Sequence, residues 1–228
     1  VAPTGTIGLL MDCDTTGIEP DFALVKFKKL AGGGYFKIVN ASVPVALQRL
    51  GYDEAQIKDI ITYICGTLSL KGAPHINARS LTDKGFLPAD LKKIEEALRG
   101  VFDLRFAFSP WNLGEKTMLR LGFSKAHAAE PGFDVLEALG FTQKEIDEAN
   151  DVICGRMTIE GAPQIQEAHL PVFDCANKCG RHGKRFIAPQ AHLKMMSAAQ
   201  PFISGAISKT VNVPNETAAE EIEQLYVE

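Results

Sequence analysis

The chain contains an internal repeat at an offset of 89 residues, which constrains its fold more than any other feature of the sequence. The stretch LQRLGYDEAQIKDIITYICGTLSLKGAPHI (residues 47–76) matches LEALGFTQKEIDEANDVICGRMTIEGAPQI (residues 136–165) at eleven of thirty positions without a gap. Leu-Gly-aromatic, Ile-Cys-Gly and Gly-Ala-Pro-x-Ile all fall in register. A repeat of this kind indicates that one structural unit is built twice.

Each copy of the repeat predicts two helices. A short helix ends at Gly51 or Gly140, because glycine takes the left-handed conformation of a helix end at little steric cost. The second helix starts at a capping residue, Asp53 or Thr142, and ends at another glycine. Its apolar residues recur at helical spacing on one face; they are Ile57, Ile60, Ile61 and Ile64 in the first copy and Ile146, Ala149 and Ile153 in the second. We therefore expect a duplicated helical unit, with a short β-prone piece after each long helix.

The rest of the chain falls on either side of this repeat. Residues 1–40 form a first zone, in which two apolar segments near 23–28 and 34–39 flank a glycine triplet and predict two short strands. Such strands have unpaired edges unless they pair with each other or with another chain. Residues 41–187 form a second zone that we interpret as an inserted helical domain.

Residues 188–228 form the third zone and predict two more helices. The first is expected from about Gln190 to Gly205, with a kink at Pro201. The second is expected to start near Thr217, which with Glu220 has the spacing of a capping box. The whole chain is thus expected to be α+β and mostly helical.

Composition excludes several classes of protein. The formal net charge is −4 and the pI is about 5.8, whereas nucleic-acid-binding domains carry surplus positive charge. No apolar run approaches the roughly 20 residues of a membrane span, and the start resembles no signal peptide. Because it lacks an initiator methionine, we read it as cut from a longer chain. An odd count of five cysteines (Cys13, Cys65, Cys154, Cys175 and Cys179) favours reduced thiols and a cytoplasmic protein.

The segment Pro3-Thr4-Gly5-Thr6-Ile7-Gly8 is the first candidate site. Its hydroxyls and glycines offer side-chain donors and backbone N–H groups that can converge on an anion, and glycine lets a phosphate approach the backbone closely. Taken alone, such a segment is more often simply a turn. Two further segments change this interpretation: Thr16-Gly17-Ile18-Glu19-Pro20, and the run AAQPFISGAISKTVNVP over residues 198–214.

Taken together, these three segments resemble the last third of the catalytic chain of class II, adenosylcobalamin-dependent ribonucleotide reductases. That family has a Pro-Thr-Gly-Thr/Ser turn, a Gly-Ile-Glu-Pro step and a Gln-Pro-Phe-Ile-Ser-Gly-Ala-Ile-Ser-Lys-Thr segment in the same order. The two matching ends span about 60 residues, and the repeat zone between them looks like an insertion of long bacterial members.

This resemblance implies a fold, an activity and a set of partners. The fold would be part of a ten-stranded α/β barrel. The activity would be vitamin B12-dependent ribonucleoside-diphosphate reduction, in which a thiyl radical generated with adenosylcobalamin allows hydrogen to replace the 2′-hydroxyl; whether the substrate is the diphosphate or the triphosphate stays open. The turn at Thr4, Gly5, Thr6 and Ile7 would contact the substrate phosphates. Partners would be the remainder of the reductase chain and the ribonucleotide, with a homodimer expected for the full-length form and neither nucleic acid nor membrane.

The chain also departs from the family pattern. No Asn-x-Cys-x-Glu run is present, so the radical cysteine and its neighbours would lie upstream, and the C-terminal reducing cysteine pair would lie downstream. We therefore assign no catalytic residue to this chain and expect it to be inactive by itself.

A second candidate site lies between residues 169 and 185. His169, Cys175, Cys179 and His182 could make a Cys₂His₂ zinc site, but their spacing matches no common zinc module, and a glycine-rich loop with reduced thiols is the interpretation we prefer. A basic cluster in the same stretch could contact an anionic phosphate of nucleotide or cobalamin, or could be a solvated loop; it consists of Lys178, Arg181, Lys184 and Arg185.

Two classes of function remain open at this point. In the first, the chain is a fragment of a catalytic subunit that supplies contacts to substrate phosphate. In the second, it is a non-catalytic binding or structural module whose duplicated insertion contacts cobalamin or forms an oligomer interface. The single tryptophan, Trp111, is expected to be a packing anchor in either case.

Overall fold

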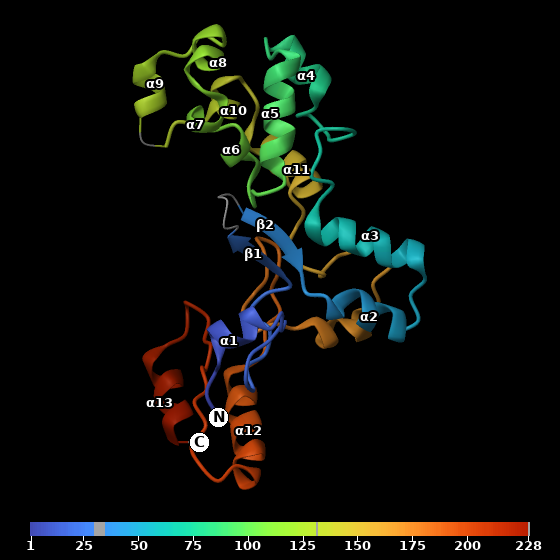
Figure 1. Ribbon diagram of the computed structural model, residues 1–228, viewed down its shortest axis with the longest axis vertical. Coiled ribbons are helices and arrows are strands. Elements are labelled where there is room, and N and C mark those ends of the chain that lie inside the picture. Colours follow the sequence, from blue (N-terminus) through green and yellow to red (C-terminus); the bar gives the residue numbers. More distant parts are fainter. Residues whose placement is uncertain (30–34, 131, 228) are drawn as a thin grey trace. The chain divides into compact units, whose positions relative to one another are not determined.

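The computed structural model describes residues 1–29, 35–130 and 132–227. Helices dominate these residues, which confirms the mostly helical expectation (Figure 1). The chain forms two compact units that are interleaved in sequence. Unit 1 comprises Val1–Val25, Val39–Ile57 and Met157–Glu228, and unit 2 comprises Lys26–Ile38 and Lys58–Arg156. The expected inserted zone, residues 41–187, is thus divided between both units.

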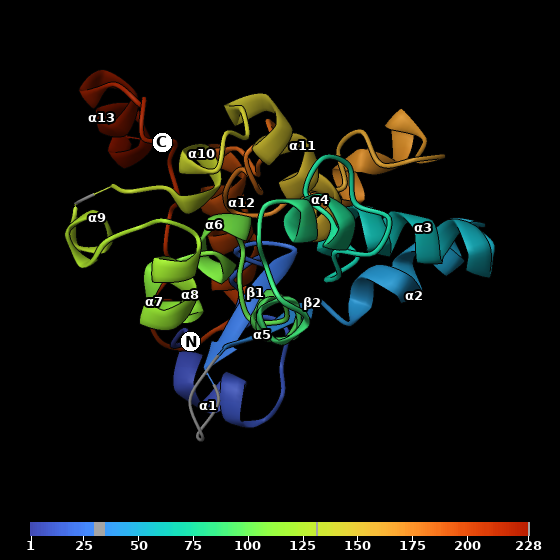
Figure 2. The ribbon, with the colours of Figure 1, turned by 90° about the horizontal axis from the view of Figure 1, so that it is seen from above.

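Two short strands form a two-stranded sheet. Strand β1 (Val25–Lys29) pairs with β2 (Tyr35–Val39), and Figures 1 and 2 show them side by side. The two predicted strands are therefore confirmed, and they pair with each other. The glycine triplet between them, Gly32 to Gly34, lies outside the described residues. No other strand occurs in the described residues. The expected β-prone pieces after the long repeat helices are wrong, because Leu68 and Met157 there have φ of 53° and 57°.

Unit 2 is a small helical body with its own hydrophobic core. Helix α5 packs against α4, α6 and α7, and α8 packs against α7 and α9 (Figure 2). The core is lined by side chains that are essentially inaccessible to solvent, among them Leu81, Ile94, Leu104 and Leu136. The helices are α4 (Ala78–Asp83), α5 (Pro88–Leu98), α6 (Leu104–Ala107), α7 (Pro110–Leu113), α8 (Glu115–Arg120), α9 (Lys125–Ala129), α10 (Val135–Ala138) and α11 (Gln143–Ile153).

Unit 1 gathers the two ends of the chain. Its helices are α1 (Gly5–Leu10), α2 (Ser42–Arg49), the 3-10 helices η1 (Glu167–Phe173) and η2 (Gln200–Phe202), α12 (Pro189–Ala199) and α13 (Ala219–Val227), while α3 (Glu54–Cys65) begins in unit 1 and ends in unit 2. The first predicted C-terminal helix ends earlier than expected. Pro201 lies in η2 and does not kink a longer helix, because its missing N–H ends the α-helical hydrogen bonding at Gln200. The second predicted C-terminal helix, α13, begins at Ala219, two residues after Thr217.

The two copies of the repeat share unusual backbone conformations as well as sequence. Five pairs of residues with positive φ recur at the offset of 89: Gly51 and Gly140, Gly66 and Gly155, Leu68 and Met157, Gly72 and Gly161, and His75 and Gln164. The predicted capping box is present in α11, where Thr142 Oγ1 accepts the N–H of Glu145 at 3.3 Å. In the first copy Asp53 Oδ1 accepts the N–H of Gln56 at 2.8 Å. The two copies are thus similar in structure at the starts and at the ends of their helices.

Within unit 2 the ends of α3 and α11 bind each other reciprocally. The N–H of Thr67 donates to Val152 O at 2.9 Å, and the equivalent N–H of Arg156 donates to Tyr63 O at 3.0 Å. The ammonium of Lys37 donates to the last carbonyls of both helices, those of Cys65 (2.8 Å) and Cys154. Burial lowers the pKa of Lys37, against the opposing effect of the two thiols. A cation at two helix C-termini is favourably placed relative to both helix dipoles.

No helix in the described part of the chain combines the length and the apolar character needed to cross a membrane.

Candidate functional site

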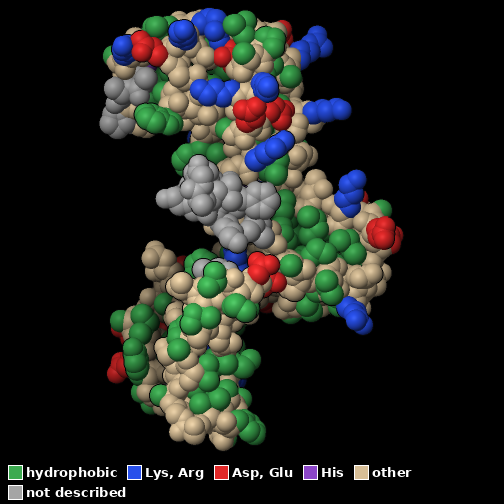
Figure 3. Space-filling view, viewed as in Figure 1, with side chains coloured by type: hydrophobic (Ala, Val, Ile, Leu, Met, Phe, Trp, Pro, Cys, Tyr) green, Lys and Arg blue, Asp and Glu red, His purple; other side chains and the backbone are tan. Residues whose placement is uncertain are grey.

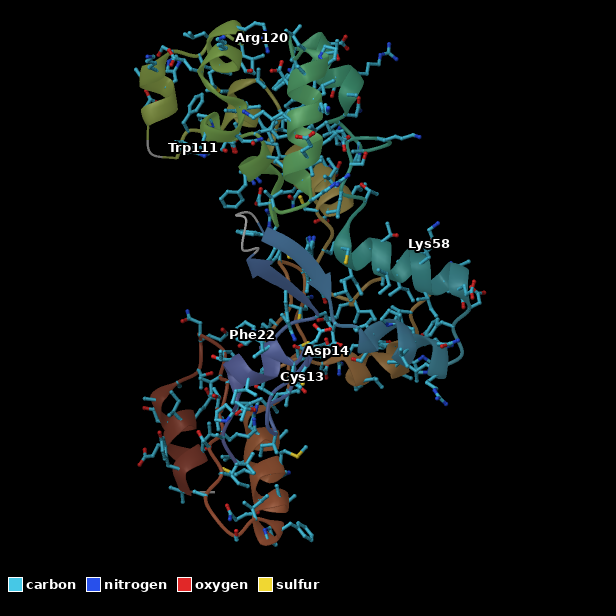
Figure 4. All side chains as sticks on the ribbon, in the orientation of Figure 1. Cys13, Asp14, Phe22, Lys58, Trp111 and Arg120 are labelled. Carbon is cyan, nitrogen blue, oxygen red and sulfur yellow. The ribbon has the colours of Figure 1, made fainter. Side chains whose placement is uncertain are left out.

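The predicted phosphate-binding turn lies at the start of α1 in unit 1. Thr4 has φ of 51° and turns the chain into the helix, whose first hydrogen bond runs from Gly8 N–H to Thr4 O at 2.7 Å. The Thr4 hydroxyl donates to Pro3 O at 2.8 Å. Figure 4 shows Cys13 and Asp14 beside α1, and the N–H of Cys13 closes the end of this helix on Gly8 O at 2.9 Å.

The donors of this turn face solvent. Thr4, Gly5, Thr6 and Ile7 are all exposed, and no acceptor in the described residues takes the N–H of Gly5, Thr6 or Ile7. These are first-turn amides, which have no partner inside a helix. A Cβ built on Gly5 would meet nothing within 4 Å, so a ligand can approach the backbone there. The turn is therefore accessible and is not enclosed by apolar side chains.

The segment from Thr16 to Glu19 packs against the turn at two points. A Cβ on Gly8 would lie 2.6 Å from Thr16 Cγ2, and one on Gly17 would lie 2.9 Å from Ala2 O. Gly17 also has φ of 56°, which glycine adopts readily. Gly17 thus allows two pieces of backbone to approach closely, whereas Gly8 leaves room for the side chain of Thr16.

Glu19 connects this segment to the third motif. Lys209 Nζ donates to Glu19 Oε2 at 2.6 Å, and the N–H of Thr210 donates to Glu19 Oε1 at 2.8 Å. The Lys209 side chain is 1% exposed and that of Glu19 15%. Both residues fall within the motifs identified in the sequence, but their pairing is not predictable from it, because 190 positions separate them.

His192 completes this buried cluster. Its Nδ1 accepts from Lys209 Nζ at 3.1 Å, because an ammonium has no acceptor. Its Nε2 has no hydrogen-bond partner among the described residues. Burial, and then the charge of Lys209, lower the pKa of His192, and Glu19 raises it. The neutral imidazole that results is the form that can accept from the ammonium. The His192 side chain is buried, with 1% exposure.

The predicted basic cluster is partly engaged within the protein. Arg185 forms a two-pronged ion pair with Asp174, with both N···O distances 2.7 Å. Lys178 pairs with Glu216 and lies 5.6 Å above the ring centroid of Phe186. Arg181 and Lys184 are exposed. The role of the basic cluster in binding an anion stays a prediction.

The predicted zinc ligands are not brought together as a set. His169 Nδ1 hydrogen-bonds the hydroxyl of Tyr52 at 2.8 Å, while Cys175 and Cys179 are buried and Cys179 takes a hydrogen bond from the Cys175 side chain. This bond lowers the pKa of Cys179 to about 7, although burial opposes the shift. Within residues 1–29, 35–130 and 132–227 no group of three or more His, Cys, Asp or Glu side chains is placed to hold a metal ion.

Trp111 in unit 2 is not a packing anchor, which corrects the expectation. Its side chain is 95% exposed and Figure 4 shows it on α7. It lines an open groove of about 450 Å³ whose other residues are Ser109, Pro110, Glu115, Met118, Leu119, Phe123, Ser124 and Lys125.

A family model described as "Ribonucleotide reductase, barrel domain" matches residues 1–83 and 125–228. The matched ranges contain all three motifs and both copies of the repeat. The unmatched residues are 84–124, which include α5 to α8 and Trp111.

Curated relatives match over the whole chain. A vitamin B12-dependent ribonucleotide reductase of Bradyrhizobium diazoefficiens is 58% identical over 228 residues, and one of Agrobacterium fabrum is 53% identical. The chain covers all of its own length in both matches but only 18% of each relative. One from Streptantibioticus cattleyicolor is 36% identical, with 22% of its length covered. The chain thus spans about a fifth of the length of the proteins it matches.

Proposed function

Because the chain belongs to the ribonucleotide reductase barrel-domain family, we propose that it is a segment of the catalytic chain of a vitamin B12-dependent ribonucleotide reductase. Such an enzyme converts ribonucleotides to deoxyribonucleotides, and bound adenosylcobalamin supplies the radical. We assign no residue of this chain to the cobalamin.

Within that enzyme, the part of this chain is to hold the phosphate groups of the substrate. The observation that carries this proposal is the exposed turn from Thr4 to Ile7, where three backbone N–H groups without acceptors lie beside two hydroxyls. Backbone donors in this arrangement suit an anion. The Thr6 hydroxyl is not engaged by any described residue, whereas that of Thr4 donates to Pro3 O and would have to rotate to reach a phosphate.

The chain does not carry the chemical step by itself. It contains no Asn-x-Cys-x-Glu sequence, and the cysteine on which the radical forms would belong to another part of the full-length enzyme. We therefore expect no ribonucleotide reduction from this chain alone.

The remainder of the reductase is the partner that best fits the exposed surface of unit 1. Large apolar side chains lie exposed on several of its elements, and Figure 3 shows hydrophobic atoms gathered over α12. A cavity of about 710 Å³ is lined by residues of α12, the segment 209–213 and α13. Patches of this kind mark interaction sites, and in a ten-stranded barrel the remaining strands and helices would cover them. The most exposed are Leu10 (83%), Phe202 (87%), Tyr226 (90%) and Val227 (83%).

An inserted binding module is the second candidate function, and one observation restricts it to residues 84–124. These residues lie outside the family model, although the repeat copies on either side lie within it. The exposed Trp111 and the groove beside it give this segment an apolar surface that the rest of unit 2 leaves open.

Binding of nucleotide to the full-length reductase tests the phosphate proposal. Thr6→Ala and Thr4→Ala each remove one donor to a charged group, which is worth about 1.5–3 kcal/mol, so the Kd for the ribonucleotide should rise roughly tenfold or more. Thr82→Ala is the control, because its hydroxyl donates to Ala78 O inside α4. Unchanged affinity in both turn variants would refute the phosphate role.

A further inference from the structure

The Glu19–Lys209 ion pair is largely buried, with side-chain exposures of 15% and 1%. Lys209 has three N–H donors and all three have acceptors: Glu19 Oε2 at 2.6 Å, His192 Nδ1 at 3.1 Å and Thr210 O at 3.2 Å. A lysine whose donors are all used has none left for a ligand. Its charge therefore serves the protein's own structure.

The partner of this lysine is equally fixed. Both carboxylate oxygens of Glu19 accept hydrogen bonds from the segment 209–210. Its own N–H donates to Thr16 O at 2.9 Å, which closes the bend from Thr16 to Glu19. Removing one member of a buried pair leaves the other charge without compensation, so this bend depends on Lys209.

The same bend supports the turn from Thr4 to Ile7. Thr16 fills the space beside Gly8, where an added Cβ would lie 2.6 Å from its Cγ2. Gly17 fits against the backbone of Ala2 and Pro3, which leads into the turn. Contact at both ends fixes the distance between Pro3 and Gly8, and the donors of the turn lie between these two residues.

The segment that carries Lys209 also binds the residue at the other side of the turn. The N–H of Ser208 donates to Val1 O at 2.9 Å. The turn is thus held from two directions by one stretch of chain, directly through Val1 and indirectly through Glu19.

We propose that Glu19 and Lys209 are positioning residues for substrate phosphate: their buried ion pair holds the bend of Thr16–Glu19 against the Thr4–Ile7 turn and so keeps its donors converged. This inference rests on the proposed function of the turn. Neither residue touches the phosphate, and the effect of each is transmitted through Thr16 and Gly17.

Hydrogen exchange in the full-length reductase tests the positioning directly. Lys209→Met removes the charge and keeps an apolar stem of similar length. In the peptide that covers residues 8–11, in which the amides of Gly8 and Met11 are hydrogen-bonded, we expect amide exchange to become at least tenfold faster. Lys178→Met is the matched control, because Lys178 also pairs with a glutamate, Glu216, but at the surface of the same unit; its exchange in this peptide should equal that of the wild type.

A milder variant covers the case in which Lys209→Met does not fold. Thr16→Ser leaves the ion pair intact and removes the methyl group that lies against Gly8. It should speed exchange in the same peptide by a smaller factor, about threefold. Unchanged exchange in Thr16→Ser and in a folded Lys209→Met enzyme would overturn the inference.

Equilibrium binding of the ribonucleotide separates this inference from the function on which it rests. If both are right, Lys209→Met and Thr6→Ala each weaken binding about tenfold, and the double variant is weaker by less than the product of the two. If Thr6→Ala weakens binding and Lys209→Met does not, the positioning role is refuted and the phosphate turn stands. If neither variant changes the Kd, the phosphate role itself fails, and with it the role of Glu19 and Lys209 toward substrate.

Discussion

Gly66 and Gly155 lie in direct backbone contact at the ends of α3 and α11. A Cβ on Gly66 would lie 2.2 Å from Ile153 O, and a Cβ on Gly155 would lie 2.3 Å from Gly66 N. The two positions are equivalent in the repeat, and both have positive φ, 79° and 76°. Each position therefore requires glycine for two reasons: its backbone has a positive φ, and a Cβ atom would collide with the opposite backbone.

Substitution of either glycine should separate these two requirements. Gly72→Ala carries only the conformational cost of about 1–2 kcal/mol, because φ there is +74° but nothing lies within 4 Å of an added Cβ. Gly66→Ala and Gly155→Ala add the cost of overpacking, about 1–3 kcal/mol. Denaturant unfolding of the full-length protein measures the difference; equal destabilisation of Gly66→Ala and Gly72→Ala would contradict the close contact.

The ammonium of Lys37 should contribute more to the free energy of unfolding than that of an exposed lysine. Lys37→Met leaves the carbonyls of Cys65 and Cys154 without their charged donor, and each such hydrogen bond is worth about 1.5–3 kcal/mol before the cost of burying the charge is subtracted. We expect a net loss of about 2 kcal/mol. Lys58→Met on the exposed face of α3 (Figure 4) is the control and should stay within about 0.5 kcal/mol of the wild type.

The thiol of Cys179 should titrate near neutral pH. The hydrogen bond from Cys175 lowers its pKa from 9.0 to about 7, so its thiolate absorbance should rise with a midpoint near that value. Cys175→Ala should move the midpoint back toward the ordinary value, and Cys179→Ser should abolish this step. Because the folded-state pKa is the lower one, the associated stability is fully present above pH 9 and is lost as the pH falls through about 7. A midpoint that ignores Cys175→Ala would contradict the thiol–thiolate contact.

Trp111 should contribute little to stability despite its size. Its side chain is 95% exposed, so Trp111→Ser should change the unfolding free energy by less than about 0.5 kcal/mol. Phe108→Ala is the contrast, because Phe108 is 1% exposed and contacts Phe86 edge to face, and its loss should cost about 3–5 kcal/mol. A large loss of stability in Trp111→Ser would indicate that the indole packs against another part of the protein.

Local patterns were sufficient to predict much of the fold. The helix ends at Gly51, Gly140, Gly66 and Gly155 follow from the conformational freedom of glycine, and the start of α11 from the capping pair of Thr142. These features depend on residues a few positions apart. The β-prone pieces after the repeat helices were predicted wrongly because local patterns do not reveal contacts between distant residues. Thr67 and Arg156 each donate a backbone hydrogen bond to the opposite copy of the repeat.

The candidate site was predictable only in part. The hydroxyls and glycines of the turn stand next to one another in the sequence, so their grouping could be anticipated. The pair of Glu19 and Lys209 could not, because no periodicity links two residues 190 positions apart. The partners of Lys178 and Arg185 escaped prediction as well, since Glu216 and Asp174 come from other parts of the loop and chain.

The single ammonium shared by α3 and α11 has a consequence for how this chain can change. Lys37 lies outside both copies of the repeat, yet it serves the last carbonyl of each. If one helix gained or lost a residue at its end, its carbonyl would leave the reach of that ammonium while the other stayed. An insertion or deletion at the end of either helix should therefore cost stability, because it removes one of the two carbonyls from the ammonium that they share.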